Sequence, residues 1–302
     1  MHGFAESLFE PGGVHGRTDH QRLKKHRTLL VGYVDSGIVS LAAQVVYFFV
    51  RDHAYHFPGE PLYRIHTDRI RQLRPDLVIA QEHCEVCAVT PGDVARSGCD
   101  LRGARVLSLS AGSLEGIFES IQQVAGALGR EREGRDVVRR ERARLDAVRA
   151  RCAGRRRPSL VMLEWTDPIF AMANWGPELV EIANGEVRLG KPGRHSSAIP
   201  GEWVAEADPE YLIVAPCGLP LARAERERPV LEAYPWWSGL RAVREGNVVF
   251  ADGNLFFNRS GMTVAQTAEI LAEILHGVTF GDAAEGRCWR RYARSSKIHL
   301  QT

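Results

Sequence analysis

The feature that most constrains the fold of this chain is an internal repeat of one short unit. The segments 65–80 and 199–214 align at a constant offset, which pairs Ile65 with Ile199, Asp68 with Glu202, Ile70 with Val204, Pro75 with Pro209 and Asp76 with Glu210. In each copy a short helical pattern stops at the proline, because proline cannot continue a helix and biases its predecessor to extended geometry. An unbroken apolar run follows, as is typical of a parallel strand that is buried on both faces. The repeat therefore predicts an α/β protein of two lobes with mainly parallel central sheets.

A stretch without proline, residues 113–157, separates the two copies. Its apolar residues recur at helical spacing, namely Ile117, Ile121, Val124, Leu128, Val138, Leu145, Val148 and Cys152. Ser113 is a suitable N-cap, and the glycines at 126, 129 and 134 favour a kink or a break. The sequence thus predicts one long backbone helix that joins an incomplete N-terminal α/β lobe (28–112) to a C-terminal α/β lobe (158–276). Residues 1–27 and 277–302 show no period and are predicted to be poorly ordered.

The charge balance argues against nucleic acid and anionic membranes as partners. The chain has 39 Lys and Arg against 37 Asp and Glu, a formal charge of +2, which is too balanced to require a polyanion. The arginines of the 113–157 stretch alternate with acidic residues, which favours a solvated face with i,i+4 ion pairs over a nucleic-acid stripe. We expect a monomer that binds a small molecule and no nucleic acid.

The apolar stretch 28–50 is a candidate membrane anchor. A span needs ~20 apolar residues, and Asp35 interrupts the stretch at a cost of roughly 2.5–3.5 kcal/mol on the insertion scale. We therefore expect a strand followed by a buried helix, with an anchor as the alternative. No signal peptide of the usual form precedes Thr28, so the sequence as written predicts a cytoplasmic protein; an upstream start or an anchor would instead place it in an extracytoplasmic, periplasmic or membrane-anchored location.

Candidate binding residues follow the strands. In open parallel sheets ligands bind beyond the carboxyl ends of the strands, and here these loops are rich in aromatic and small polar side chains, which suits a large, partly apolar ligand. The candidate ligand-binding residues are Gln81, Glu82, Cys84, Cys87, Trp165, Trp175, Cys217, Phe256, Phe257 and Asn258. For Trp165 and Trp175, packing in the core is an equal alternative, and we expect packing for Trp236 and Trp237.

The cysteines leave a second hypothesis open, a redox or metal-binding protein that uses Cys84, Cys87 and Cys217. A zinc site would need a second CxxC or an HxxxH, which the sequence lacks, and a redox dithiol normally opens a helix after a strand. Buried or loop-packing cysteines are the usual state of free cysteine. The complete motifs GxGxxG, GxxxxGK[ST] and GxSxG are absent, which excludes dinucleotide, P-loop and common hydrolase sites. We expect no enzyme, no catalytic residue and no metal ligand.

Five segments together carry a family resemblance: 73–88, 163–165, 175–180, 215–218 and 252–259. The chain resembles the cobalamin-binding branch of the periplasmic-binding-protein superfamily, the substrate-binding components of vitamin B12 and iron-siderophore ABC importers, over roughly residues 60–276. The resemblance implies two α/β lobes joined by one backbone helix, a cobalamin, related corrinoid or siderophore-like ligand between them, and an ABC permease as partner. Gln81, Trp165, Trp175 and Phe256 stand where ligand-lining residues stand in relatives. Only Phe256 matches in type, because Gln81 replaces a strand-end aromatic of some members.

The beginning of the chain departs from this family. Members open with a strand and a Ser-rich loop of the type IVSLLPSATE, followed by further strands, and this opening is absent here. The first lobe is therefore predicted to be short by two strands unless 28–50 supplies substitutes. Missing strands would leave unpaired edges, so a truncated relative without a ligand is the third hypothesis.

Overall fold

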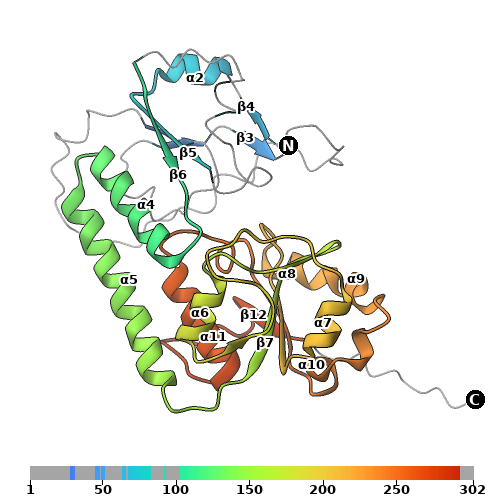
Figure 1. Ribbon diagram of the computed structural model, residues 1–302. Helices are drawn as coiled ribbons and strands as arrows, with labels where there is room; N and C mark the ends of the chain where they lie inside the picture. Colours follow the sequence, from blue (N-terminus) through green and yellow to red (C-terminus); the bar gives the residue numbers. More distant parts are fainter. Residues whose placement is uncertain are drawn as a thin grey trace, which may run out of the picture.

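The computed structural model describes residues 28–30, 45–47, 49–51, 63–65, 67–82, 92, 95 and 103–292. Within these residues the chain forms two α/β lobes, with two long helices along one side (Figure 1). The predicted α/β architecture of two lobes is confirmed. Residues 1–27, which are predicted to be poorly ordered, lie outside the described residues.

The N-terminal lobe contains a parallel sheet in the order β2-β1-β5-β6 and a separate antiparallel pair, β3-β4. Its elements are β1 (Thr28–Leu30), β2 (Val45–Tyr47), β3 (Phe49–Arg51), β4 (Tyr63–Ile65), α2 (Thr67–Leu73), β5 (Leu77–Gln81) and β6 (Arg105–Leu109). The strand predicted at Thr28 is therefore present, and it pairs with β5. The helix expected to follow is wrong for residues 45–47 and 49–51, which are strands; Val, Tyr and Phe, which dominate them, favour extended structure. Residues 31–44 lie outside the described residues.

The repeat is confirmed down to its backbone geometry. Helix α2 leads to β5, and α7 (Glu202–Ala207) leads to β10 (Tyr211–Val214). Each helix ends at a residue in the left-handed conformation, Arg74 with φ 43° and Asp208 with φ 32°, immediately before the repeated proline. The amide of each donates to the carbonyl four residues earlier, over 3.0 Å in the first copy and 3.2 Å in the second. This turn closes the helix and redirects the chain into the buried strand.

The connection between the lobes consists of two helices, which corrects the prediction of one helix over 113–157. Helix α4 (Leu114–Ala127) is capped by the Ser113 side chain, which accepts from the amide of Gly116, and α5 spans Glu131–Cys152. The break falls at Gly129, whose φ of 67° a side chain would oppose. The two helices pack against each other, and the longer α5 runs back along the molecule to the second lobe (Figure 1).

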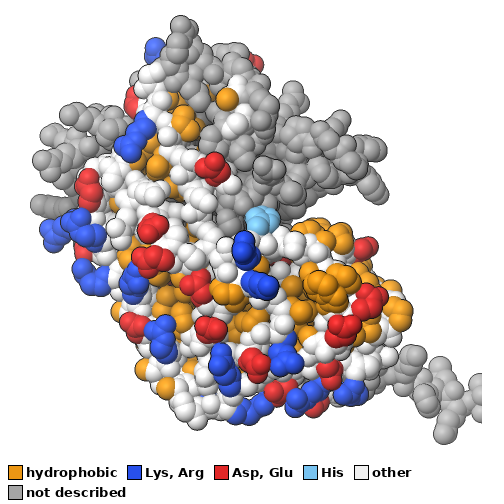
Figure 2. Space-filling model, in the orientation of Figure 1, with side chains coloured by type: hydrophobic (Ala, Val, Ile, Leu, Met, Phe, Trp, Pro, Cys, Tyr) orange, Lys and Arg blue, Asp and Glu red, His pale blue; other side chains and the backbone are white. Residues whose placement is uncertain are grey.

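Charges of both signs are interspersed on the face of the molecule that Figure 2 shows. On α5, Arg139 pairs with Asp136 over 2.8 Å and Arg149 with Asp146 over 2.6 Å. The predicted ion-paired face is present, with i,i+3 rather than i,i+4 spacing in these two pairs.

The C-terminal lobe contains a sheet in the order β12-β11-β10-β7-β8, with β9 also paired to β7. Strands β7, β10 and β11 are parallel, whereas β8 and β12 run antiparallel to their neighbours. The remaining elements of this lobe are β7 (Ser159–Thr166), β8 (Ile169–Ala171), α6 (Gly176–Ile182), β9 (Glu186–Val187), α8 (Leu221–Ala224), η2 (Glu225–Glu227), α9 (Arg228–Glu232), η3 (Trp237–Gly239), α10 (Arg241–Arg244), β11 (Val248–Ala251), α11 (Val264–His276) and β12 (Trp289–Arg291).

Both faces of this sheet are buried, as the unbroken apolar runs predict. Leu160 and Met162 of β7 belong to the cluster that includes α5, α6 and α11, whereas Val161 and Leu163 belong to the cluster on the opposite face. This alternation follows from the two-residue period of a strand. The expected packing of Trp237 is confirmed at 4% exposure, and Trp236 stacks on Tyr234 with ring centroids 4.9 Å apart.

The tail corrects another prediction, because residues up to 292 are part of the C-terminal lobe. Strand β12 pairs with β11, and Cys288 and Trp289 are buried. The Glu273 carboxylate on α11 accepts hydrogen bonds from the amides of Ala284 and Glu285 and from the Trp289 indole. This side chain provides the anchor that a search for periodicity cannot detect.

Candidate functional site

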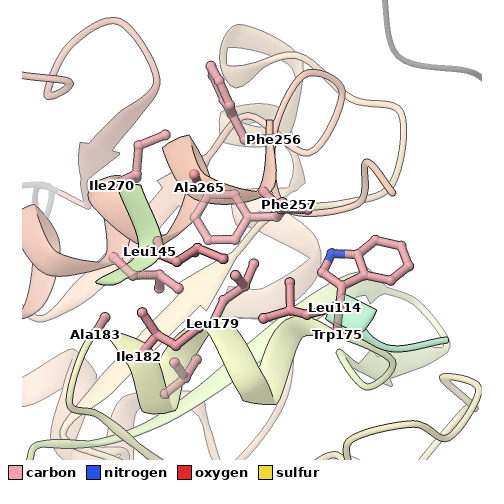
Figure 3. Close-up of a cluster of buried hydrophobic side chains, with 14 of the residues drawn as sticks. Leu114, Leu145, Trp175, Leu179, Ile182, Ala183, Phe256, Phe257, Ala265 and Ile270 are labelled. Atoms are coloured by element: carbon pink, nitrogen blue, oxygen red, sulfur yellow. The ribbon is translucent and has the colours of Figure 1, made fainter. Parts of the chain in front are cut away.

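The strand ends of the two lobes approach each other where β6 leads into α4. The amide of Leu114, the first residue of α4, donates to the Glu178 carboxylate in the first turn of α6 over 2.9 Å. Leu114 also lies near Trp175, which precedes α6 (Figure 3). Gly176, at the start of α6, lies against the side chain of Met162 in the middle of β7, so the carboxyl half of β7 begins near this junction.

Close backbone contacts fix the loops at the strand ends of the C-terminal lobe. The amide of Cys217 donates to the carbonyl of Glu164 over 2.9 Å, which joins the loops after β10 and β7. The Asn258 side chain donates to the carbonyl of Ala215 over 2.7 Å. A Cβ at Gly253 would lie 2.2 Å from the carbonyl oxygen of Pro216, so only glycine permits the loops after β10 and β11 to approach this closely.

The loop after β11 is shaped by Asp252, whose carboxylate accepts from the amides of Asn254 (2.9 Å) and Leu255 (2.7 Å). This turn leaves the Leu255 side chain 50% exposed. The Arg259 guanidinium donates to the carbonyl of Asn254 and closes the same loop. The strand-end surface therefore includes an exposed aliphatic side chain on a fixed backbone.

A polar niche, formed by Glu164, Asn174 and Ser196, lies beside these loops. Burial raises the pKa of Glu164 to about 7, against which the hydrogen bond from Ser196 acts. The Ser196 hydroxyl oxygen accepts from the amide of Ala173 over 3.0 Å and from the Asn174 side chain over 3.4 Å. A hydrogen bond of 2.6 Å joins His195 Nδ1 to the carbonyl of Ser196, so Nδ1 carries the proton.

These three residues were not among the predicted ligand-binding residues. The signal was the charged Glu164 within an otherwise apolar strand, SLVMLEWT. Asn174 and Ser196 carried no comparable signal, because their proximity depends on two loops that meet only in the folded chain: Asn174 donates its amide to the carbonyl of Arg194 over 2.8 Å.

The predicted site residues separate into three groups. The first group is partly exposed at the strand ends and consists of Trp165, Cys217, Asn258 and Gln81. Glu82 is exposed there as well, and its carboxylate accepts a hydrogen bond from the Ser108 hydroxyl over 2.8 Å. Trp175, Phe256 and Phe257 lie in the core cluster of Figure 3 with 6%, 7% and 1% exposure, so packing accounts for most of their surface. Cys84 and Cys87 lie outside the described residues.

No group of three or more His, Cys, Asp or Glu side chains within the described ranges is arranged to hold a metal ion. A separate open groove of about 600 Å³ lies beside the start of β7, at the end opposite to the candidate site; it is lined by Arg188 of the segment after β9 and by Trp203 of α7, among others.

The two-lobed chain has recognisable relatives among known proteins. A family model described as "Periplasmic binding protein" matches residues 62–255. The chain belongs to the periplasmic binding protein family. None of the curated proteins compared with the chain matches it.

Several solved structures share the fold of this periplasmic binding protein. A periplasmic heme binding protein from Pseudomonas aeruginosa is 19% identical with a TM-score of 0.67, and the match covers 89% of this chain and 98% of that one. An ABC transporter substrate-binding protein from Listeria monocytogenes is 17% identical, with a TM-score of 0.64 and coverage of 83% and 98%. The periplasmic vitamin B12 binding protein of Vibrio cholerae is 16% identical, with a TM-score of 0.60 and coverage of 84% and 98%.

Membership of this family identifies the chain as a binding protein rather than an enzyme. The prediction that the chain is not an enzyme is confirmed on this basis. The cytoplasmic location expected from the sequence has no support, because the matching family is described as periplasmic. Among the residues that the structure describes, no helix is both long and apolar enough to cross a membrane.

Proposed function

We propose that this binding protein holds a corrinoid between its two lobes and delivers it, outside the cytoplasmic membrane, to an ABC permease. The observation that carries the proposal is the chemistry of the strand ends beside the junction. The partly exposed Trp165 supplies an aromatic surface, Leu255 an aliphatic one, and Asn258 an amide. A corrinoid combines a large apolar macrocycle with neutral polar side chains, and such a lining suits it.

Two related ligands compete with the corrinoid, haem and an iron siderophore. The fold is compatible with haem as well as with a corrinoid, because the structural neighbours include proteins described as binding heme and vitamin B12. The siderophore is a competitor because of the family resemblance found in the sequence. The choice among them depends on the side chains of this chain, so the three ligands are compared directly.

The experiment is isothermal titration of the purified protein with cyanocobalamin, with hemin and with a ferric hydroxamate siderophore. We expect cyanocobalamin to bind most tightly. Absence of both heat and spectral change with cyanocobalamin at ~100 µM, an affinity weaker than about −5.5 kcal/mol, would refute the proposal. Tight binding of hemin or of the siderophore alone would replace the corrinoid by that ligand.

Two tryptophan variants localise the site. Trp165→Ala removes the aromatic surface at the end of β7, and we expect cyanocobalamin to bind about tenfold more weakly, a loss of about 1.4 kcal/mol. Trp203→Ala is the matched control, because Trp203 lies on α7, lines the separate groove beside the start of β7 and is 49% exposed. Equal effects of the two substitutions would contradict a site at the strand ends.

A further inference from the structure

The niche of Glu164, Asn174 and Ser196 has more hydrogen-bond acceptors than donors. The Ser196 hydroxyl accepts from Ala173 and from Asn174, and its single proton is directed to Glu164. A carboxylate offers about four acceptor sites, so the hydroxyl fills only part of the capacity of Glu164. Glu164 and Asn174 therefore both lie next to the Ser196 hydroxyl.

Asn174 adds an acceptor that has no protein partner. Asn174 is 9% exposed, and its side-chain oxygen Oδ1 is buried without a hydrogen bond. The backbone of Asn174 is left-handed, with φ 54°, and its carbonyl accepts from the amide of Gly193 over 3.0 Å. This loop therefore holds the unpartnered oxygen in place. A buried acceptor of this kind is unusual in a folded protein and points to a group that is supplied from outside.

Glu164 connects the niche to the strand-end surface beside the junction of the lobes, whereas Asn174 Oδ1 lies buried behind it. Glu164 lies at the irregularity in β7 between Leu163 and Trp165, at the carboxyl end of the strand, and is partly exposed. Asn174 immediately precedes Trp175 and α6, the helix that contacts the start of α4. The niche thus lies at the edge of the C-terminal lobe that is next to the N-terminal lobe.

We infer that the Glu164–Asn174–Ser196 niche is a specificity determinant, which binds a neutral N–H donor, the carboxamide of a corrinoid side chain, and disfavours the carboxylates of a haem. The inference rests on the proposed function and refines it. A carboxamide carries two N–H donors, which match the two acceptors that Glu164 and Asn174 present. A haem presents propionate carboxylates, which donate nothing to Asn174 Oδ1 and place a like charge beside an ionised Glu164.

The pKa of Glu164 sets the conditions for the test. Burial raises this pKa to about 7, so at pH 8 the carboxyl is mostly ionised. There it accepts strongly from an amide and repels a carboxylate, because hydrogen bonds to charged acceptors are the stronger ones. The discrimination between the two ligands is therefore measured at pH 8.

The test titrates the full chain with cyanocobalamin and with hemin, as wild type, Glu164→Gln and Asn174→Gly. We expect Glu164→Gln to raise the Kd of cyanocobalamin at least tenfold while the Kd of hemin stays the same or falls. Asn174→Gly keeps the left-handed backbone and removes Oδ1, so it should weaken cyanocobalamin alone. Glu206→Gln, an exposed carboxylate on α7, is the control and should change neither Kd.

The outcomes separate the inference from the proposed function. If the wild type binds cyanocobalamin but both substitutions leave the ratio of the two Kd values unchanged, the niche is not a specificity determinant and the corrinoid proposal stands. If the wild type prefers hemin, the inference and the corrinoid assignment are both overturned. If the wild type binds neither ligand, the proposed function fails, and the inference with it.

Discussion

Replacing Glu164 by Gln should remove a pH-dependent loss of stability. The ordinary pKa of a glutamate is 4.5, and burial raises that of Glu164 to about 7 in the folded protein. Between these two values the folded state retains a proton that the unfolded state has released, so the free energy of unfolding falls as the pH rises. At 1.36 kcal/mol per pKa unit, the wild type loses about 3 kcal/mol by pH 8.

Glutamine has the size and hydrogen-bonding reach of glutamate and does not ionise. The stabilising contribution of the protonated carboxyl is complete below pH 4.5 and lost as the pH passes 7, so the variant should match the wild type most closely near pH 4.5. By pH 8 the variant should have gained up to about 3 kcal/mol over the wild type. Urea denaturation of both proteins at a series of pH values, followed by tryptophan fluorescence, measures this difference.

Other buried groups titrate in the same range, and the comparison removes them. Burial lowers the pKa of His276, which makes stability rise with pH up to about 6.5, and burial raises the pKa of Glu141, which acts in the opposite direction. Both contributions are common to the two proteins and cancel in their difference. Parallel pH profiles of wild type and Glu164→Gln would refute the argument that burial controls this carboxyl.

Three further substitutions test the packing. Gly253→Ala places a Cβ 2.2 Å from the Pro216 carbonyl oxygen and should destabilise the protein by roughly 2 kcal/mol. Gly126→Ala is the control: its Cβ meets no neighbour within 4 Å, so it should stabilise the protein by about 0.5–1 kcal/mol. The midpoints of urea denaturation measure both effects, and equal shifts would contradict the close approach at Gly253. Trp289→Ala removes an indole that is 2% exposed and should cost about 3–5 kcal/mol, so a change below about 1 kcal/mol in the same assay would show that the tail is not part of the core.

The repeat was predictable because each of its parts has a strong local cause. Pro75 and Pro209 follow a helical pattern that they cannot continue, and the apolar runs after them are long enough to indicate buried strands. The helix break at Gly129 was only partly predictable: the glycines indicated a weak point, but tertiary packing of α4 on α5 decides between a kink and a turn.

The candidate site and the tail were less accessible to sequence reasoning. An aromatic residue at a strand end can either contact a ligand or pack in the core. Only the burial seen in the structure distinguishes the partly exposed Trp165 from the buried Trp175. The three-residue strand β12 is too short to show a period. Asn174 and Ser196 meet through loops, and loop pairing depends on long-range contacts that the local sequence does not encode.

The short strands at the borders of the C-terminal sheet have a consequence for the protein in solution. An uncovered strand presents a row of free amides and carbonyls that can recruit the strand of another molecule and lead to aggregation. Here β12 covers β11, and β8 and β9 together cover β7. The strand β12 has only three residues, of which Arg290 and Arg291 are exposed, so charged side chains and a short template protect the sheet from growing by addition of a neighbouring chain.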